Sequence, residues 1–207
     1  MVGNCSCNDE QLMQRIVEEQ DETAWARLAD RYREPLVRFC ASYVSDAHQA
    51  EDIAHDVLVR IRERCHTFDP GQTFRPWLYR IARNRCIDYL RQAGGGPQWD
   101  ANSSVGLFVE RICDTTTSPR GKANRHELRH HVLQALESLS ETSRTALVLR
   151  YFNGLSTKGV AEALGVSHAN ARVRIFRGMK ALREAVAPCL SDTGEERLRS
   201  VFSGDIE

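Results

Sequence analysis

The sequence predicts an all-α protein: two small helical domains joined by a flexible linker, with a helix-turn-helix in the second domain. Apolar residues recur at helical spacing along most of the 207 residues, and the alternating pattern of a β-strand appears nowhere. A stretch rich in Gly, Ser, Thr and Asn divides the helical pattern. We therefore expect a leader and helix over 1–22, a first domain over 23–92, a linker over 93–125, a second domain over 126–187 and a tail over 188–207.

Charge is distributed unevenly along the chain. The formal net charge is zero, which argues against a simple polycation. Residues 74–92 nevertheless carry five Arg and one Asp, and residues 126–187 carry nine Lys and Arg against five Glu. Residues 42–56 hold four acids and no Lys or Arg. Two basic islands and one acidic island predict more than one kind of partner surface.

Neither a membrane segment nor a metal site is expected. No run of about 18 apolar residues occurs, and the N-terminus lacks the pattern of a signal sequence, so we expect a cytoplasmic protein. Cys5 and Cys7 are one residue apart, whereas zinc ligands are spaced more widely. We expect no cofactor. The thiols of Cys40, Cys65 and Cys86 lie in apolar helical patterns and are expected to be buried.

The first domain reads as a series of helices with one prominent loop. We expect helices over 9–20 and 21–33, and another that starts at Pro35, which suits a first helical turn. Asp46 caps a long helix to about Cys65, with an inner side formed by Ala50, Ile53, Ala54, Val57 and Ile61. Residues 67–75 form a loop, and Pro76 starts a helix that runs to about Gln92.

Two surfaces of this domain have a possible function and an ordinary alternative. The long helix turns Asp52, His55, Asp56 and Glu63 outward, which fits either a solvated face or a docking surface for a basic protein. On the helix after Pro76, Trp77, Arg80 and Asn84 share one side, with Arg83 and Arg91 nearby. Arg neutralises phosphate, a ring stacks on an exposed base and Asn reads a base edge, so this side suits single-stranded nucleic acid. The alternative places Trp77 in the core and the arginines in solvent.

The second domain contains two short helices joined by a tight turn, over Leu155–Leu182. Ser156 and Ser167 are candidate caps, and Gly165 suits the left-handed turn between the helices. The second helix is polar on one side, where Val173, Phe176, Arg177 and Lys180 lie with Arg172 and Arg174 on the flanks. Such a helix enters the DNA major groove in helix-turn-helix proteins, although an ordinary hairpin with a solvated basic face has the same pattern.

Three blocks together resemble sigma factors of the sigma-70 family, of the extracytoplasmic-function (ECF) type. AEDIAHDVLVRI (Ala50–Ile61) and FRPWLYRIARNRCIDYLR (Phe74–Arg91) are similar to region 2, and Leu136–Arg183 is similar to region 4. The resemblance implies a non-enzymatic transcription initiation factor that binds core RNA polymerase, directs it to promoter DNA and helps to melt the −10 element. It also allows an anti-sigma factor as a partner. A stand-alone helix-turn-helix regulator and a helical adaptor that binds only protein are the alternatives.

The resemblance also assigns roles to residues of this chain. The polymerase-binding surface would comprise Glu51, Asp52, His55 and Asp56. The element that melts the −10 sequence would comprise the loop over 67–75 and Phe74, Arg75, Trp77, Arg80, Arg83 and Asn84. The −35 element would be read by Ser167, His168, Asn170, Arg172, Arg174, Phe176, Arg177 and Lys180.

The chain departs from the family pattern at a few positions. The family often has Glu where this chain has Gly159, which would complete a Ser-x-x-Glu capping box with Ser156. We expect this glycine to weaken its helix by about 1 kcal/mol. His55 stands where Gln is usual, and Ala169-Asn170-Ala171 replaces a frequent Gly-Thr-Val at the start of the recognition helix.

Overall fold

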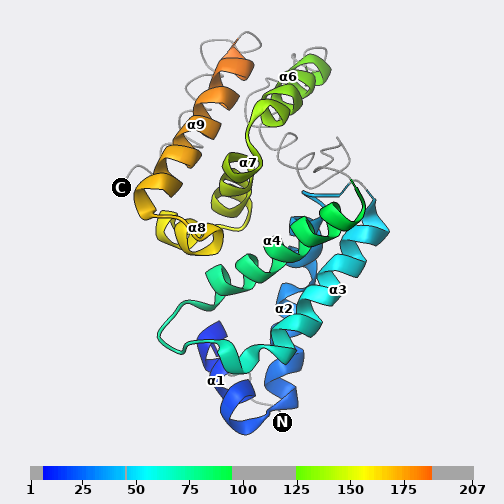
Figure 1. Ribbon diagram of the computed structural model, residues 1–207, viewed down its shortest axis with the longest axis vertical. Helices are drawn as coiled ribbons and strands as arrows, with labels where there is room; N and C mark the ends of the chain where they lie inside the picture. The colour runs from blue at the N-terminus through cyan, green and yellow to red at the C-terminus, as the bar shows by residue number, and fades with distance from the viewer. Residues whose placement is uncertain (1–6, 45, 95–124, 188–207) are drawn as a thin grey trace.

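The computed structural model describes residues 7–44, 46–94 and 125–187, and every regular element in these ranges is helical (Figure 1). The first lobe contains α1 (Asp9–Glu19), α2 (Glu22–Cys40), α3 (Ala47–Glu63), the short 3₁₀ helix η1 (Cys65–Thr67) and α4 (Phe74–Gln92). The second contains α6 (Arg125–Ser138), α7 (Glu141–Leu147), the π-helical turn η3 (Val148–Phe152), α8 (Thr157–Leu164) and α9 (His168–Val186). The all-α prediction is confirmed. Most of the predicted leader, linker and tail lies outside the described residues, as does Cys5.

Side-chain caps start the first three helices. Asn8 and Gln11 form a reciprocal capping box at α1. The Asp21 carboxylate accepts hydrogen bonds from two backbone N–H groups at the start of α2, and Asp46 does the same at α3. The predicted Asp46 cap is confirmed, and the five residues predicted for the inner side of α3 are all buried.

Helix α2 is longer than predicted. A helix that starts at Pro35 is wrong, because Pro35 lies inside one continuous helix. Proline removes one backbone hydrogen bond and costs roughly 3 kcal/mol inside a helix. The apolar stripe nevertheless continues across it, since Tyr32, Leu36 and Phe39 are all buried. Burial of this stripe holds the helix together through the proline.

Helix α4 begins at Phe74, two residues earlier than predicted. Thr73 makes no side-chain cap; instead the backbone N–H of Phe74 donates to the carboxylate of Glu10, from α1, at 2.9 Å. The Phe74 ring is fully buried, with its centroid 5.4 Å from that of Tyr32 and 5.9 Å from that of Phe68. A residue from α1 and an aromatic cluster therefore fix the start of α4.

The second lobe packs α7 closely against α9. A Cβ added at Gly178 would lie 2.7 Å from a methyl group of Leu147, so only glycine permits this approach. Ser156 and Ser167 cap α8 and α9 as predicted, and Gly165 has the expected left-handed conformation at φ 66°. Half of the capping box survives in α8, since the Ser156 hydroxyl accepts the Gly159 N–H at 3.0 Å.

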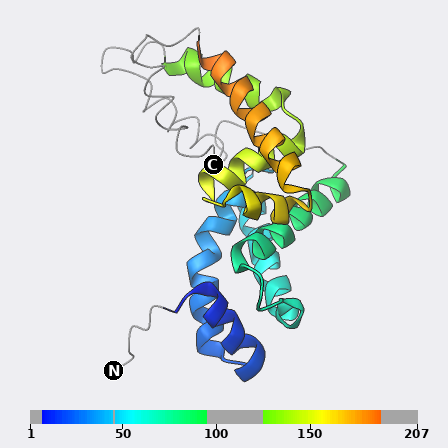
Figure 2. The ribbon, with the colours of Figure 1, turned by 90° about the vertical axis from the view of Figure 1, so that its left-hand side faces the viewer.

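The two lobes are in direct contact. Helix α8 lies against α4, between the two halves of the molecule, and both views show this arrangement (Figures 1 and 2). Residues that are about 100 positions apart in sequence therefore share one interface, as in the hydrogen bond between Tyr43 and Thr145. No helix in the described part of the chain is long and apolar enough to cross a bilayer.

Candidate nucleic-acid interface

The acidic side chains predicted on α3 lie on its outer face. Glu51, Asp52 and His55 are exposed, and Asp56 is half-buried. Val59 continues this face and is 42% exposed, which is unusual for an apolar residue in this protein. An apolar side chain among carboxylates suits contact with a basic protein surface that also has apolar atoms.

Asp56 has a structural role that the sequence did not reveal. Arg85 from α4 donates to its Oδ2 through Nε at 3.1 Å and Nη2 at 2.6 Å. The Arg85 side chain is only 15% exposed, whereas that of Asp56 is 48% exposed. Asp56 therefore joins α3 to α4, while its other oxygen makes no hydrogen bond among the described residues.

The α4 residues predicted to contact single-stranded DNA differ in how exposed their side chains are. Arg80 and Asn84 are exposed. Trp77 is half-buried, with its ring centroid 5.3 Å from that of Phe68 and 5.9 Å from that of Phe74. Trp77 therefore combines the two alternatives, because part of the ring packs in the core and part is accessible.

The other three predicted contacts on α4 are occupied within the protein. Phe74 is buried in the aromatic cluster, so its prediction as a DNA contact is wrong for this conformation. Arg75 donates to the backbone carbonyl of Asn153, in the second lobe. Arg83 forms an ion pair with Glu141 at 3.1 Å. Arg75 nevertheless remains exposed, so Arg75, Arg80 and Asn84 are the exposed members of the predicted set.

The recognition helix α9 presents its predicted face to solvent. Phe176 is 63% exposed and Val173 is 44% exposed. The polar members of this face are also exposed, namely Ser167, His168, Asn170, Arg172, Arg177 and Lys180. Ala171, Gly178 and Leu182 are buried on the opposite side. The predicted polarity of α9 is confirmed.

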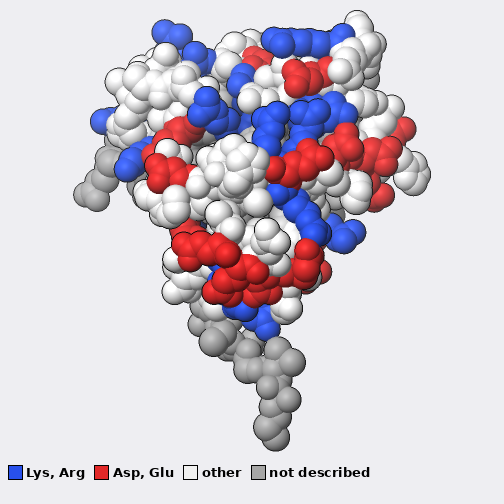
Figure 3. Space-filling model, turned by 60° about the horizontal axis from the view of Figure 1, so that its bottom comes forward, with Lys and Arg blue, Asp and Glu red and all other residues white. Residues whose placement is uncertain are grey.

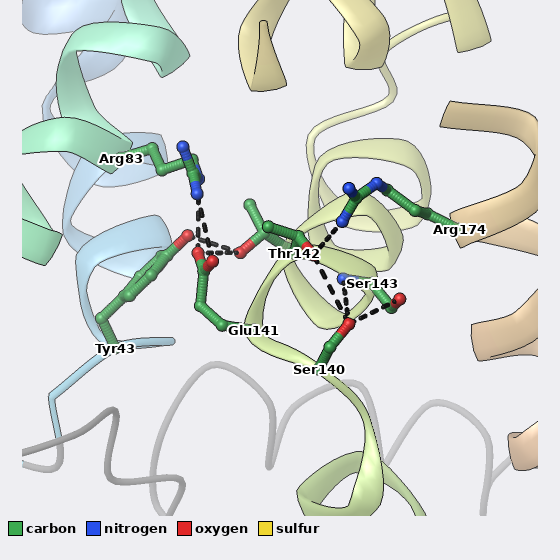
Figure 4. A network of polar contacts seen from close by, with 8 residues as sticks. Tyr43, Arg83, Ser140, Glu141, Thr142, Ser143 and Arg174 are labelled. Carbon is green, nitrogen blue, oxygen red and sulfur yellow. Dashed lines mark hydrogen bonds and ion pairs between the residues drawn. The ribbon is translucent and has the colours of Figure 1, made fainter. Parts of the chain in front are cut away.

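Arg174 differs from the other basic residues of α9. It is half-buried, its Nε donates to Asn170 Oδ1 at 3.0 Å, and its Nη1 donates to the Thr142 hydroxyl in the first turn of α7 (Figure 4). The bond to Asn170 lies within α9, whereas the bond to Thr142 reaches another helix. In this conformation Arg174 links α9 to α7.

The face drawn in Figure 3 carries no single broad basic region: its basic side chains lie in separate groups, and acidic side chains gather in a band on its lower part. This agrees with the zero net charge. Because affinity for DNA depends on cations beside phosphates, binding must rely on local clusters such as the exposed arginines of α9. None of the described residues forms a cluster of metal-binding type.

Comparisons with known proteins agree with this geometry. Sigma-70 region 2 matches residues 28–95, and Sigma-70, region 4 matches residues 129–182. The ECF RNA polymerase sigma factor SigW of Bacillus subtilis is 30% identical over 81% of this chain and 91% of its own length. The RNA polymerase sigma-H factor of Pseudomonas aeruginosa is 31% identical over 89% of this chain and 96% of its own. The chain belongs to the sigma-70 family. It is a sigma factor of the ECF type, a transcription initiation factor that binds RNA polymerase and directs it to promoters.

Solved structures show the same fold for this sigma factor. CnrH in complex with the cytosolic domain of CnrY superposes with a TM-score of 0.61 at 20% identity, covering 87% of this chain and 97% of that one. The sigma factor RpoE, in complex with the anti-sigma factor NepR from Bartonella quintana, gives a TM-score of 0.56 at 20% identity, covering 79% and 96%. The region 2 match over the first lobe sets aside a stand-alone helix-turn-helix regulator, which would have no need of that lobe.

Proposed function

We propose that three separate surfaces of this sigma factor each make one of the contacts that transcription initiation requires. The outer face of α3, with Glu51, Asp52, His55 and Asp56, docks on core RNA polymerase. The exposed side of α4, with Trp77, Arg80 and Asn84, holds the melted −10 element. The outer face of α9 enters the major groove at the −35 element. The factor acts in the cytoplasm and catalyses no reaction itself.

The observation that carries this proposal is the accessible side of α4. Arg80 and Asn84 are exposed beside the half-buried Trp77 ring, which places a cation, an amide and a π-face next to one another. This combination suits an unstacked base and its phosphate better than it suits duplex DNA. A protein that reads only duplex DNA has no use for it.

The outer face of α9 supports the second DNA contact. Residues near the start of a recognition helix reach base edges, and Asn170 and Arg172 occupy that position with exposed side chains. An Arg that reaches a guanine edge contributes about 1–3 kcal/mol of discrimination. Phe176 supplies an apolar contact of the kind that thymine methyl groups accept.

An anti-sigma factor is a further partner in this proposal. One structural neighbour was determined in complex with the anti-sigma factor NepR, and another in complex with the cytosolic domain of CnrY. The exposed apolar side chains of Val59 and Phe176 are suitable anchors for a protein that must cover both the polymerase face and the −35 face.

Reconstitution with core RNA polymerase tests the proposal. A promoter selected from genomic DNA by the holoenzyme is probed with permanganate, which oxidises unpaired thymines, and by run-off transcription. The proposal expects a reactive −10 region and a defined transcript that both require the factor. Tight binding of duplex DNA by the factor with neither an open region nor a transcript would refute it.

A further inference from the structure

A pocket of about 140 Å³ lies where α2, α4 and η3 meet. The residues that matter for its chemistry are Arg38, Phe39, Arg75, Tyr79, Phe152 and Asn153. A cavity of roughly 150 Å³ in a protein core is large enough to hold benzene. The pocket therefore has room for a ligand built on one small ring, and its two phenylalanines offer the apolar surface against which such a ring packs.

One buried polar atom of this pocket makes no hydrogen bond. Asn153 is 8% exposed, and its Oδ1 is buried without a hydrogen-bond partner among the described residues. The Nδ2 of the same amide donates to the Tyr79 hydroxyl at 2.7 Å, which fixes the orientation of the amide. A buried acceptor without a donor is costly, so an N–H or O–H group of a ligand gains more affinity here than at an exposed acceptor.

Two guanidinium groups flank the same pocket. Arg38 pairs with Glu34 on its own helix, and Arg75 donates to the backbone carbonyl of Asn153. A guanidinium has five N–H donors, so each arginine keeps donors for a second acceptor. The two arginines and Glu34 together leave one net positive charge. This balance matches a carboxylate, with its single negative charge, better than a phosphate dianion.

The Tyr79 hydroxyl supplies a further donor. Burial raises the pKa of Tyr79 above the usual value for a phenol, while the nearby charges of Arg75 and Arg38 lower it to a smaller extent. The hydroxyl therefore keeps its hydrogen near neutral pH. Because its oxygen accepts the bond from Asn153, this hydrogen can be donated to an anionic group in the pocket.

We propose that this pocket binds a small aromatic carboxylic acid that carries a hydroxyl or amino group. The carboxylate accepts hydrogen bonds from Arg38 and Arg75, and the ring packs against the phenylalanines. The hydroxyl or amino group of the ligand donates to Asn153 Oδ1. An acid that lacks this donor leaves the buried acceptor unpaired, so the site discriminates against it. The inference goes beyond the proposed contacts with polymerase and DNA and does not depend on them.

A panel of ligands tests the site in the unmodified full-length chain. Isothermal titration calorimetry compares the three isomers of hydroxybenzoate with benzoate, which lacks the donor, and with phenol, which lacks the carboxylate. We expect at least one hydroxybenzoate to bind with a Kd of about 0.1 mM, roughly tenfold more tightly than benzoate and phenol.

Three results of this titration would overturn the proposal. They are no saturation by any hydroxybenzoate up to about 10 mM, equal affinity for hydroxybenzoate and benzoate, and tighter binding of inorganic phosphate than of every hydroxybenzoate. Transcription does not enter the measurement, so failure of this site leaves the proposed function untouched, and failure of the proposed function leaves the site untouched.

Arg38→Met tests where the acid binds. Methionine keeps an unbranched side chain and removes the charge, so affinity for the best hydroxybenzoate should fall by roughly tenfold. Arg33→Met is the matched control, because Arg33 is exposed on the same helix and does not line the pocket. Circular dichroism confirms that both variants are folded. Wild-type affinity in a folded Arg38→Met variant would show that the acid binds elsewhere and would refute the site.

Asn153→Leu tests the buried acceptor separately. Leucine is close to asparagine in size and has no oxygen, so the variant should bind hydroxybenzoate and benzoate with equal affinity. The ligand panel and Arg38→Met keep the proposal testable if this variant does not fold. A folded Asn153→Leu variant that still prefers hydroxybenzoate by roughly tenfold would contradict the assigned role of Asn153.

Discussion

At the scale of single residues, a few side chains connect parts of the molecule that are distant in sequence. Glu10 accepts the backbone N–H of Phe74, 64 residues away, and so performs the capping that Thr73 does not. Asp56 joins α3 to α4 through Arg85. Residues of this kind fix the orientation of α4, on which the proposed contact with melted DNA depends.

Glu10 therefore provides a stability test. We expect Glu10→Ala to lower the free energy of unfolding by about 1 kcal/mol, the usual effect of losing a helix cap. Glu10→Gln should recover most of the loss, because its amide oxygen still accepts the hydrogen bond. Urea unfolding measures both. Glu18→Ala, on the exposed side of α1, is the control, and an equal loss in Glu10→Ala and Glu18→Ala would contradict the capping role.

Asn84 tests the proposed contact with the −10 element. Its side chain is exposed, so Asn84→Ala should leave the fold intact. We expect permanganate reactivity of the −10 region to fall by roughly tenfold, as befits the loss of one base contact of about 1–3 kcal/mol. Footprinting of the −35 element should be unchanged; equal losses at both elements would show that Asn84 does not act in melting.

At the scale of elements, α9 carries the proposed −35 contact on a face that the described residues leave exposed. Arg177→Ala should weaken duplex binding by the factor and reduce the slope of log affinity against log salt by about 1, if Arg177 meets a phosphate. Arg183→Ala, six residues further along the same helix, is the control. Titration with core polymerase should give wild-type affinity, and loss of that affinity in Arg177→Ala would count against the assignment.

Arg174 has a different expected effect from Arg177. Since its guanidinium is bonded to Thr142, Arg174→Ala should act through the orientation of α9. Thr142→Val removes the same bond from the other side and should weaken duplex binding to a similar extent, within about twofold. A much larger loss for Arg174→Ala than for Thr142→Val, measured by fluorescence anisotropy, would instead favour a direct contact with DNA.

The sequence predicted most elements of the fold and fewer of their contacts. Periodicity and caps located α1, α3, α8 and α9 because these signals are local. The same signals failed at Pro35, where burial of a continuous stripe outweighed the local preference of proline. They also failed at the start of α4, where the cap comes from Glu10 on another helix.

For the candidate site, too, local spacing predicted which side chains are exposed but not which of them contact distant parts of the chain. The polarity of α9 follows from spacing within one helix, and its exposed face agrees with the prediction. The engagement of Arg75, Arg83 and Arg174 depends on partners elsewhere in the chain, and no local pattern contains that information. Gly159 was visible in the sequence as a departure from the family, but its packing against Pro76 explains it only in three dimensions.

At the scale of the whole molecule, the two lobes exist in contact while their proposed targets are far apart on DNA. The lobes must therefore separate before both elements of one promoter are bound. Once the lobes are free to separate, a modest affinity for the −10 element and a modest affinity for the −35 element combine into a high affinity for the whole promoter.

Energy transfer between the two lobes measures directly whether they separate on the promoter. Donor and acceptor dyes on unnatural amino acids at Gln72 and Lys158 flank the contact between Thr73 and Glu162, whose side chains approach within 3.4 Å. Energy transfer is compared between the free factor and the open complex with core polymerase. We expect efficient transfer in the free factor and its loss in the open complex. Equal transfer in the two states would contradict it.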